Sequence, residues 1–188
     1  MEEEKRKKVL LELARKAIEK TLANNRLTIT PLSEIIDIEK EKELAEILEE
    51  KKGVFVTLKK SGQVRGCIGT ISKDEIWIQV QKYAVFSAFN DPRFPPVEKE
   101  ELKDIKIEIS VLDDPKDIKN IEEIELGKDG IIMEIGGKGG VLLPEVAVEY
   151  GVKTPQEFLE MLCRKIGIPN DSWKKAKIKK FRTEKITE

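Results

Sequence analysis

The stretch GVFVTLKKSGQVRGCIGT, residues 53–70, decides how the rest of the chain is arranged. It contains two apolar runs separated by the polar segment Lys-Lys-Ser-Gly-Gln. In the first run Val54, Val56 and Leu58 recur at a period of two, which predicts a strand with one buried face. The Ser-Gly pair between the runs favours a tight turn, so we predict a β-hairpin over this stretch.

Cys67 lies in the second strand of that hairpin, between Gly66 and Gly69 in the motif R-G-C-I-G. Glycine weakens a strand unless something approaches the backbone closely, so these two glycines would leave room for a ligand or for another loop. In a regular strand Arg65 and Cys67 share a face and lie about 7 Å apart. A guanidinium at that range favours a thiolate. Cys67 is therefore either a reactive thiol or a small buried one in a glycine-kinked strand.

The composition of the chain narrows the classes of function. Its 188 residues are enough for one large domain or two small lobes. Charged residues make up 38%, and the prevalence of Lys and Glu among them is typical of proteins from very hot environments. The 35 basic and 36 acidic residues give a formal net charge of −1, so no global basic field attracts nucleic acid.

The chain contains no histidine, which removes Ser-His-Asp and Cys-His pairs from its chemistry. A zinc ion would have to use carboxylates and at most two thiolates, so we predict no metal site and no cofactor. A hard metal ion bound by carboxylates alone stays an open alternative, but the sequence has no recognisable spacing for one. The two cysteines, at positions 67 and 163 without a signal peptide, favour reduced thiols and a cytoplasmic protein. No apolar run approaches the ~18 residues of a membrane-spanning helix, so we expect no membrane association.

Four further elements are predicted in the N-terminal part of the chain. They are helices over residues 4–25, 39–52 and 72–90 and a strand over residues 106–112. Gly53 is expected to end the second helix. Ser72–Glu75 fits a capping box for the third, which stops at Asn90 because the residue before a proline avoids helical dihedrals.

Residues 113–117 form a polar turn and a candidate boundary between two lobes. Beyond it we predict strands over 131–135 and 141–143, a helix from Thr154-Pro155 to Gly167, and a basic extended segment over 174–182. The segment 136–140 around Lys138 lacks the G-x-x-x-x-G-K-[ST] pattern, so it is interpreted as a hairpin turn. The basic segment is interpreted as a solvated edge strand. Helices and strands mix without regular βαβ alternation, which indicates an α+β fold.

The loop DPRFPPV, residues 91–97, is the second candidate site, because three prolines make it stiff. In one interpretation it presents Asp91 and Arg93 to a ligand. In the other, Asp91 orders the turn and pairs with Arg93, while Phe94 fills the core. The sequence leaves both interpretations open.

Several strings together resemble the AMMECR-one family, named for the Alport, midface hypoplasia and elliptocytosis chromosomal region. They are GVFVTL, VRGCIGT, FSAFNDPRFPPV, IEISVL, VLLPEVAVEYG and EFLEMLCRKIGIPNDSW. The resemblance implies that residues 1–188 form a single domain of two unequal α+β lobes. Each lobe would be a largely antiparallel sheet packed with helices, and the larger would contain both chain ends. The resemblance brings no established activity, but it implies an uncharacterised modification pathway with Memo-like and radical-SAM partners.

The resemblance also carries site residues over to this chain. Its signature falls on Arg65, Gly66, Cys67, Ile68 and Gly69, and its loop falls on Asp91, Pro92, Arg93 and Phe94. Family members often place a histidine just before the glycine that is Gly130 here, whereas this chain has Asp129. A Cys–His dyad is therefore not implied for this chain, and Asp129 would orient a ligand or accept a proton.

Three functions follow as hypotheses. In the first, the protein is a cysteine-dependent enzyme or accessory subunit: Cys67 is the nucleophile, Arg65 stabilises its thiolate or an anionic substrate, and Asp91 and Arg93 border the pocket. In the second, it is a non-catalytic protein-binding module in which Arg65, Arg93 and Phe94 anchor a partner. The third is RNA binding through the basic segment 174–182.

Overall fold

The predicted hairpin is present as strands β1 (Lys51–Lys60) and β2 (Gln63–Glu75), which pair antiparallel. The turn between them places Ser61 at φ 52° and Gly62 at φ 78°. Two consecutive positive φ values are typical of the tight turns that match the twist of a hairpin. Val54, Val56 and Leu58 are fully buried, which confirms the face predicted from their spacing.

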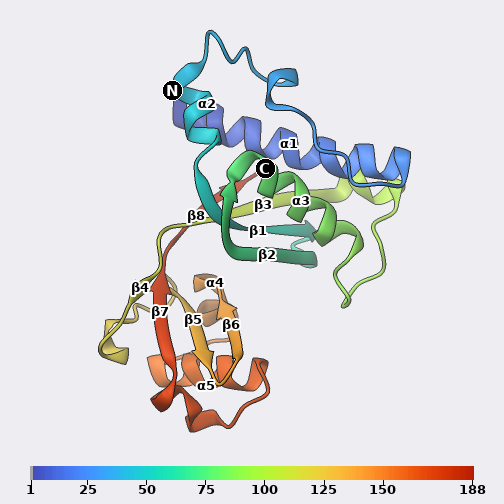
Figure 1. The fold of residues 1–188 in the computed structure, drawn as a ribbon. Coiled ribbons are helices and arrows are strands. Elements are labelled where there is room, and N and C mark those ends of the chain that lie inside the picture. Colours follow the sequence, from blue (N-terminus) through green and yellow to red (C-terminus); the bar gives the residue numbers. More distant parts are fainter. Residues whose placement is uncertain (1) are drawn as a thin grey trace. The chain divides into compact units, whose positions relative to one another are not determined.

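The structure is a computed structural model that describes residues 2–188, and the chain divides into two compact units. The larger unit comprises residues up to 111 together with residues 185–188, and the smaller comprises residues 112–184. Each unit has one four-stranded sheet packed with helices (Figure 1). The predicted α+β class, with unequal lobes and both ends of the chain in the larger, is confirmed.

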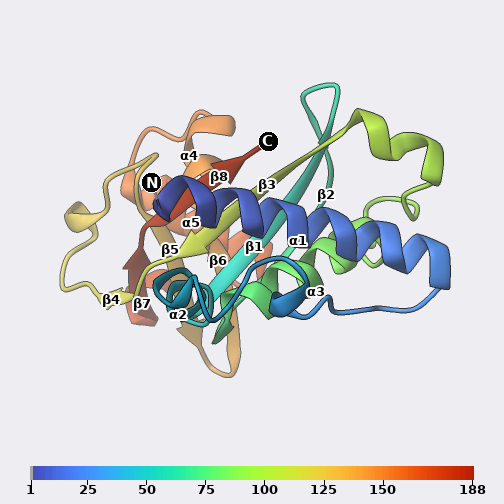
Figure 2. The same cartoon turned by 90° about the horizontal axis from the view of Figure 1, so that it is seen from above.

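The larger unit is a sheet with the strand order β2-β1-β3-β8 and helices that cover one face (Figure 2). Its remaining elements are α1 (Glu2–Asn24), η1 (Leu32–Glu34), α2 (Lys42–Leu48), α3 (Ile76–Phe89), η2 (Lys99–Asp104), β3 (Ile105–Leu112) and β8 (Thr183–Thr187). The three α-helices share one apolar core with β1 and β3. Ile107, Ile109 and Val111 of β3 are buried in that core, as their alternation predicts.

Two predictions around this sheet are wrong. The helix predicted over residues 39–52 is shorter in the structure, where α2 spans Lys42–Leu48. Gly53 lies inside β1 and does not end a helix. A Cβ at Gly53 would lie 2.7 Å from the carbonyl oxygen of Thr70. The glycine therefore allows the backbones of β1 and β2 to approach closely at this point. Ser72–Glu75 forms no capping box, because these residues continue β2 and the last two pair with β1. The predicted end of the third helix at Asn90 is confirmed by its C-cap.

The smaller unit is a sheet with the strand order β4-β7-β5-β6. Its elements are β4 (Lys116–Asp117), η3 (Ile121–Glu123), β5 (Gly130–Ile135), β6 (Lys138–Leu142), α4 (Pro144–Glu149), α5 (Pro155–Lys165), η4 (Asn170–Lys175) and β7 (Lys177–Phe181). Its core joins β5 to α5 through buried side chains that include Met133, Phe158, Leu162 and Cys163.

Local signals in the smaller unit are mostly confirmed. Helix α5 starts as predicted, since Thr154 Oγ1 accepts a hydrogen bond from the backbone N–H of Glu157 at 3.2 Å and Pro155 follows the cap. Gly136 and Gly137 have positive φ and form the tight turn between β5 and β6. The edge-strand prediction for the basic segment is wrong, because β7 pairs with β4 on one side and β5 on the other.

None of the helices within residues 2–188 combines the length and the apolar character needed to cross a membrane. The longest, α1, carries acidic residues throughout its first turn.

Candidate functional site

The signature strand β2 contains a bulge at Arg65. Leu58 of β1 lies opposite Gly66, and the next residue of β1, Lys59, lies opposite Val64. Arg65 is therefore an extra residue with no partner in β1, and bulges of this kind re-aim a side chain. The regular alternation that predicted Arg65 and Cys67 on one face does not hold at this point of the strand.

Arg65 binds the loop and the segment that follows it. Its Nε and Nη2 atoms donate to the two carboxylate oxygens of Glu101, at 3.1 and 2.8 Å. Its Nη1 and Nη2 atoms donate to the carbonyl oxygens of Pro95 and Pro96, at 2.9 and 3.3 Å. The guanidinium therefore holds residues 95–101 beside β2.

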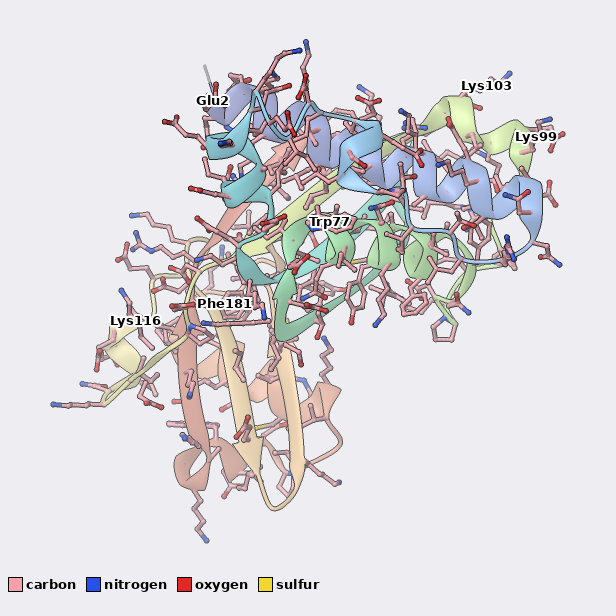
Figure 3. All side chains as sticks on the ribbon, turned by 45° about the horizontal axis from the view of Figure 1, so that its top comes forward. Glu2, Trp77, Lys99, Lys103, Lys116 and Phe181 are labelled. Atoms are coloured by element: carbon pink, nitrogen blue, oxygen red, sulfur yellow. The ribbon has the colours of Figure 1, made fainter. Side chains whose placement is uncertain are left out.

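Glu101 is the counterpart that sequence reasoning missed. Besides Arg65, it accepts a hydrogen bond from Lys60 Nζ at 2.9 Å and from the backbone N–H of Glu98 at 3.1 Å. Hydrogen bonds from Arg65 and then Lys60 lower the pKa of Glu101 to about 2. Glu101 lies in η2, whose ends carry the outward-pointing Lys99 and Lys103 (Figure 3). In the sequence it is one acidic residue in the charged run EKEELKD, and nothing there distinguishes it from Glu98 or Glu100.

Asp91 brings the proline loop onto the strand at Cys67. Its carboxylate, with a residue exposure of 5%, accepts a hydrogen bond from the backbone N–H of Cys67 at 2.8 Å. It also accepts from Arg93 Nε at 3.0 Å and Arg93 Nη2 at 2.7 Å. The side chain of Arg93 is the main cause that lowers the pKa of Asp91 to about 2. Arg93 Nη2 further donates to the carbonyl oxygen of Cys67 at 3.3 Å.

The thiol of Cys67 is half-buried and faces a hydroxyl. Thr57 lies directly opposite Cys67 in β1, and its Oγ1 donates to Sγ at 3.2 Å. Thr57 was not among the predicted site residues. The hairpin pairing would have found it only with the bulge at Arg65 known, because the bulge shifts the register by one residue.

The space expected at Gly66 and Gly69 is occupied by the protein itself. A Cβ at Gly66 would lie 2.0 Å from the backbone carbonyl oxygen of Ser87 in α3. A Cβ at Gly69 would lie 2.3 Å from the ring of Phe55. The two glycines therefore allow a helix and an aromatic ring to approach the strand, rather than leaving a cradle for a ligand.

The close approach of α3 also brings in the hydroxyl of Ser87, which the sequence did not single out. Ser87 Oγ accepts a hydrogen bond from the backbone N–H of Ile68 at 2.8 Å and donates to the carbonyl oxygen of Val56 at 2.7 Å. Ile68 and Val56 are opposite each other in the hairpin, so one buried hydroxyl ties the helix to both strands.

The outer side of the loop is exposed. The side chain of Arg93 is 60% exposed, and its guanidinium carbon lies 5.4 Å from the centre of the Phe94 ring. Phe94 is only half-buried and so does not fill the core as one interpretation expected. We call Pro92, Arg93, Phe94, Pro95 and Pro96 together the proline-loop surface.

Asp129 belongs to the smaller unit and is held by donors from that unit. Its carboxylate is 1% exposed and accepts from the backbone N–H of Glu125 at 2.9 Å, Lys180 Nζ at 3.0 Å and Arg182 Nε at 3.2 Å. Burial alone raises the pKa of Asp129, but these hydrogen bonds outweigh it and keep that pKa below its ordinary value. The arrangement is typical of a structural clamp, and it engages two of the cations considered for RNA binding.

A metal site does not emerge from the described part of the chain. Among residues 2–188 there is no group of three or more Cys, Asp or Glu residues placed to hold a metal ion.

The fold, together with the contact between β2 and the proline loop, defines a class of protein. It is a two-unit α+β protein in which a bulged, glycine-containing outer strand is tied to a stiff proline loop. The chain belongs to the AMMECR1 family, whose model matches residues 11–186. This confirms the resemblance that the motifs carry.

Proteins of similar sequence, and one solved structure, support this family assignment. The chain is 40% identical to protein PF1979 of Pyrococcus furiosus over 93% of its own length and 84% of the relative. It is also 40% identical to protein Mbar_A1807 of Methanosarcina barkeri over 88% of its own length and 81% of the relative. The crystal structure of uncharacterized protein PH0010 from Pyrococcus horikoshii is similar with a TM-score of 0.80 and 38% identity, covering 94% of this chain and 88% of that one. These names state no activity.

Proposed function

We propose that the protein is a non-catalytic binding module in which the R-G-C-I-G strand holds the proline-loop surface in position to recognise a protein partner. The observation that supports this proposal is that polar groups of the two motifs are bound to other parts of the protein. Arg65 and Asp91 donate to and accept from neighbouring parts of the same unit, so they build the loop's position. Chemistry on a substrate would require such groups to be available to it.

The physical properties of the loop suit recognition. Proline residues and the hydrogen bonds to β2 fix the loop before binding, which lowers the entropy lost when a partner docks. Arginine and aromatic side chains are enriched among the residues that dominate binding energy at protein interfaces. Arg93 and Phe94 supply both kinds of side chain on one exposed surface.

The partner class and the cellular location are proposals that rest on the family resemblance and on the sequence. Memo-like and radical-SAM proteins are the first partners to try, and the expected setting is cytoplasmic. RNA binding ranks last, since Lys180 and Arg182 are engaged by Asp129.

Titration with a purified Memo-like protein and a radical-SAM protein from the same organism tests the proposal. We expect Arg93→Ala and Phe94→Ala each to weaken binding at least about tenfold, which corresponds to about 1.4 kcal/mol. Arg26→Ala is the matched control, because Arg26 is an exposed arginine outside the loop and should bind like wild type.

Each variant must first show one cooperative thermal unfolding transition well above the temperature of the binding measurement. Equal affinity of wild type, Arg93→Ala and Phe94→Ala for whichever probe binds would contradict the proposal. If wild type binds neither probe, Memo-like and radical-SAM proteins are both rejected as partners.

Cysteine chemistry is a second candidate, and one observation favours it. Thr57 donates a hydrogen bond to Sγ of the half-buried residue Cys67, and a donor at that position stabilises a thiolate. No histidine is present to act as its base. The reactivity of the Cys67 thiol therefore separates the two candidates.

A further inference from the structure

The strand β2 is the outermost strand of its sheet. With 13 residues it is long, and among the described residues its strand neighbour is β1 alone. An outer strand presents backbone N–H and C=O groups that can pair with another chain, and natural proteins protect such edges.

The backbone of Cys67 shows what protects this edge. In an antiparallel strand the N–H and C=O groups of one residue point to the same side. The N–H of Cys67 donates to Asp91 and its C=O accepts from Arg93, so both groups point away from β1. Asp91 supplies one acceptor and Arg93 one donor, which is the same pair of groups that a residue in an added strand would supply.

Other features of β2 limit pairing on either side of this point. The bulge at Arg65 breaks the strand's regular course, and its side chain holds the carbonyl groups of Pro95 and Pro96 alongside. A second irregularity separates the pairs Lys52–Asp74 and Val54–Thr70, where three residues of β2 face one of β1. Both are recognised ways of blunting an edge, and they leave Cys67 near the middle of the stretch that could still pair.

That stretch has the composition of a strand that self-associates. Residues 64–71, VRGCIGTI, contain one charge and several β-favouring side chains. Val64 is 36% exposed and Ile71 is 40% exposed, one on each side of Cys67. Antiparallel pairing of two copies about a two-fold axis near Cys67 would bring Val64 of one copy close to Ile71 of the other.

We propose that the outer edge of β2 is a strand-docking edge for a second copy of the chain, and that the Asp91–Arg93 pair keeps it closed. Loss of Arg93 frees the carbonyl oxygen of Cys67 and removes the side chain that holds Asp91 on the Cys67 N–H, which makes symmetric β2–β2 pairing favourable. This inference is independent of the proposed function, because it concerns the chain on its own.

Sedimentation velocity over a concentration series tests the inference. Arg93→Ala removes the donor and one partner of Asp91, and the exposure of Arg93 makes a folded variant the expected outcome. We expect its dimer dissociation constant to fall at least about tenfold below that of wild type. Arg26→Ala is the matched control and should behave as wild type.

Crosslinking identifies the surface. Two-fold pairing near residue 67 places the two Cys67 thiols close together, so a short bis-maleimide should link Arg93→Ala dimers through Cys67, and Cys67→Ser should abolish the link. The backbone N–H of Gly69 should exchange more slowly in the dimer. If Arg93→Ala is not folded, Arg93→Met, which keeps a long side chain but has no donor, replaces it.

A folded variant that stays as monomeric as Arg26→Ala would overturn the inference. So would a dimer that does not crosslink through Cys67 and leaves the Gly69 amide unprotected. Partner binding is judged separately on Phe94→Ala, which leaves the Asp91–Arg93 pair in place.

Discussion

Ser87 shows how a single buried hydroxyl can organise the neighbourhood of a signature motif. Its Oγ lies between a donor on β2 and an acceptor on β1, and its own carbonyl oxygen rests against Gly66. Gly66 is therefore explained by helix packing, since any Cβ would collide with backbone atoms of α3. The motif's glycine and the helix's serine form one structural unit.

We predict that Ser87→Ala lowers the free energy of unfolding by about 1–3 kcal/mol, the usual effect of leaving buried polar groups unsatisfied. The backbone N–H of Ile68 and the carbonyl of Val56 would each lose a partner. Urea unfolding measures the change. Ser33→Ala, at an exposed serine, is the control and should change stability by less than about 0.5 kcal/mol. Equal stabilities for the two variants would show that the bridge contributes nothing.

At the scale of elements, the proline loop is fixed to β2 by two carboxylates. Asp91 acts at the start of the loop and Glu101 after its end, and each is bound by an arginine. Arg65 and Arg93 come from the two motifs that identify the family. Their first role in this structure is to hold strand and loop together.

These carboxylates predict a pH dependence of stability. Both have a folded-state pKa of about 2, below the ordinary values of about 4 expected in the unfolded chain. As the pH falls, the unfolded chain takes up protons first, so stability falls with it. The contribution is fully present above about pH 5.5 and is lost as the pH approaches 2; we expect a loss of about 1–2 kcal/mol from the pair after allowance for solvent screening.

Denaturant unfolding across this pH range checks the prediction. The double variant Asp91→Asn with Glu101→Gln should show a smaller fall in stability between about pH 5.5 and about pH 2 than wild type, because it lacks both titrating groups. Glu100→Gln, a change at an exposed neighbour, should keep the wild-type slope. An unchanged slope in the double variant would mean that the two carboxylates do not couple the loop to folding.

Across the whole molecule, the sequence predicts what is decided locally. Alternation placed Val54, Val56 and Leu58 in the core, and the Asn90-Asp91-Pro92 signal ended α3 at the right residue. The sequence also predicted the start of α5 at the capping residue Thr154 and its end at Gly167. In each case the cause lies within a few residues of the effect.

What the sequence did not predict depends on residues far apart in the chain. The bulge at Arg65 makes sense only with Glu101 and the carbonyl groups of the loop in place. Gly53 looked like a helix end because its partner, the backbone of Thr70, is not its sequence neighbour.

The last residues provide a further long-range example, since Glu188 returns to the larger unit. Its backbone N–H donates to Ile107 and its carboxylate binds Arg15. Nothing local in the C-terminal segment specifies these contacts.

In the proposed function, the signature motifs build a recognition surface rather than an active thiol. The most direct measurement is the alkylation rate of Cys67 at about pH 7, where an ordinary thiol is mostly protonated, compared between the native and the urea-unfolded protein. Cys163→Ser can serve as the background, because Cys163 is fully buried and burial raises the pKa of its thiol. We expect native Cys67 to react no faster than unfolded Cys67. Native Cys67 reacting many times faster, with the excess lost in Thr57→Val, would contradict it.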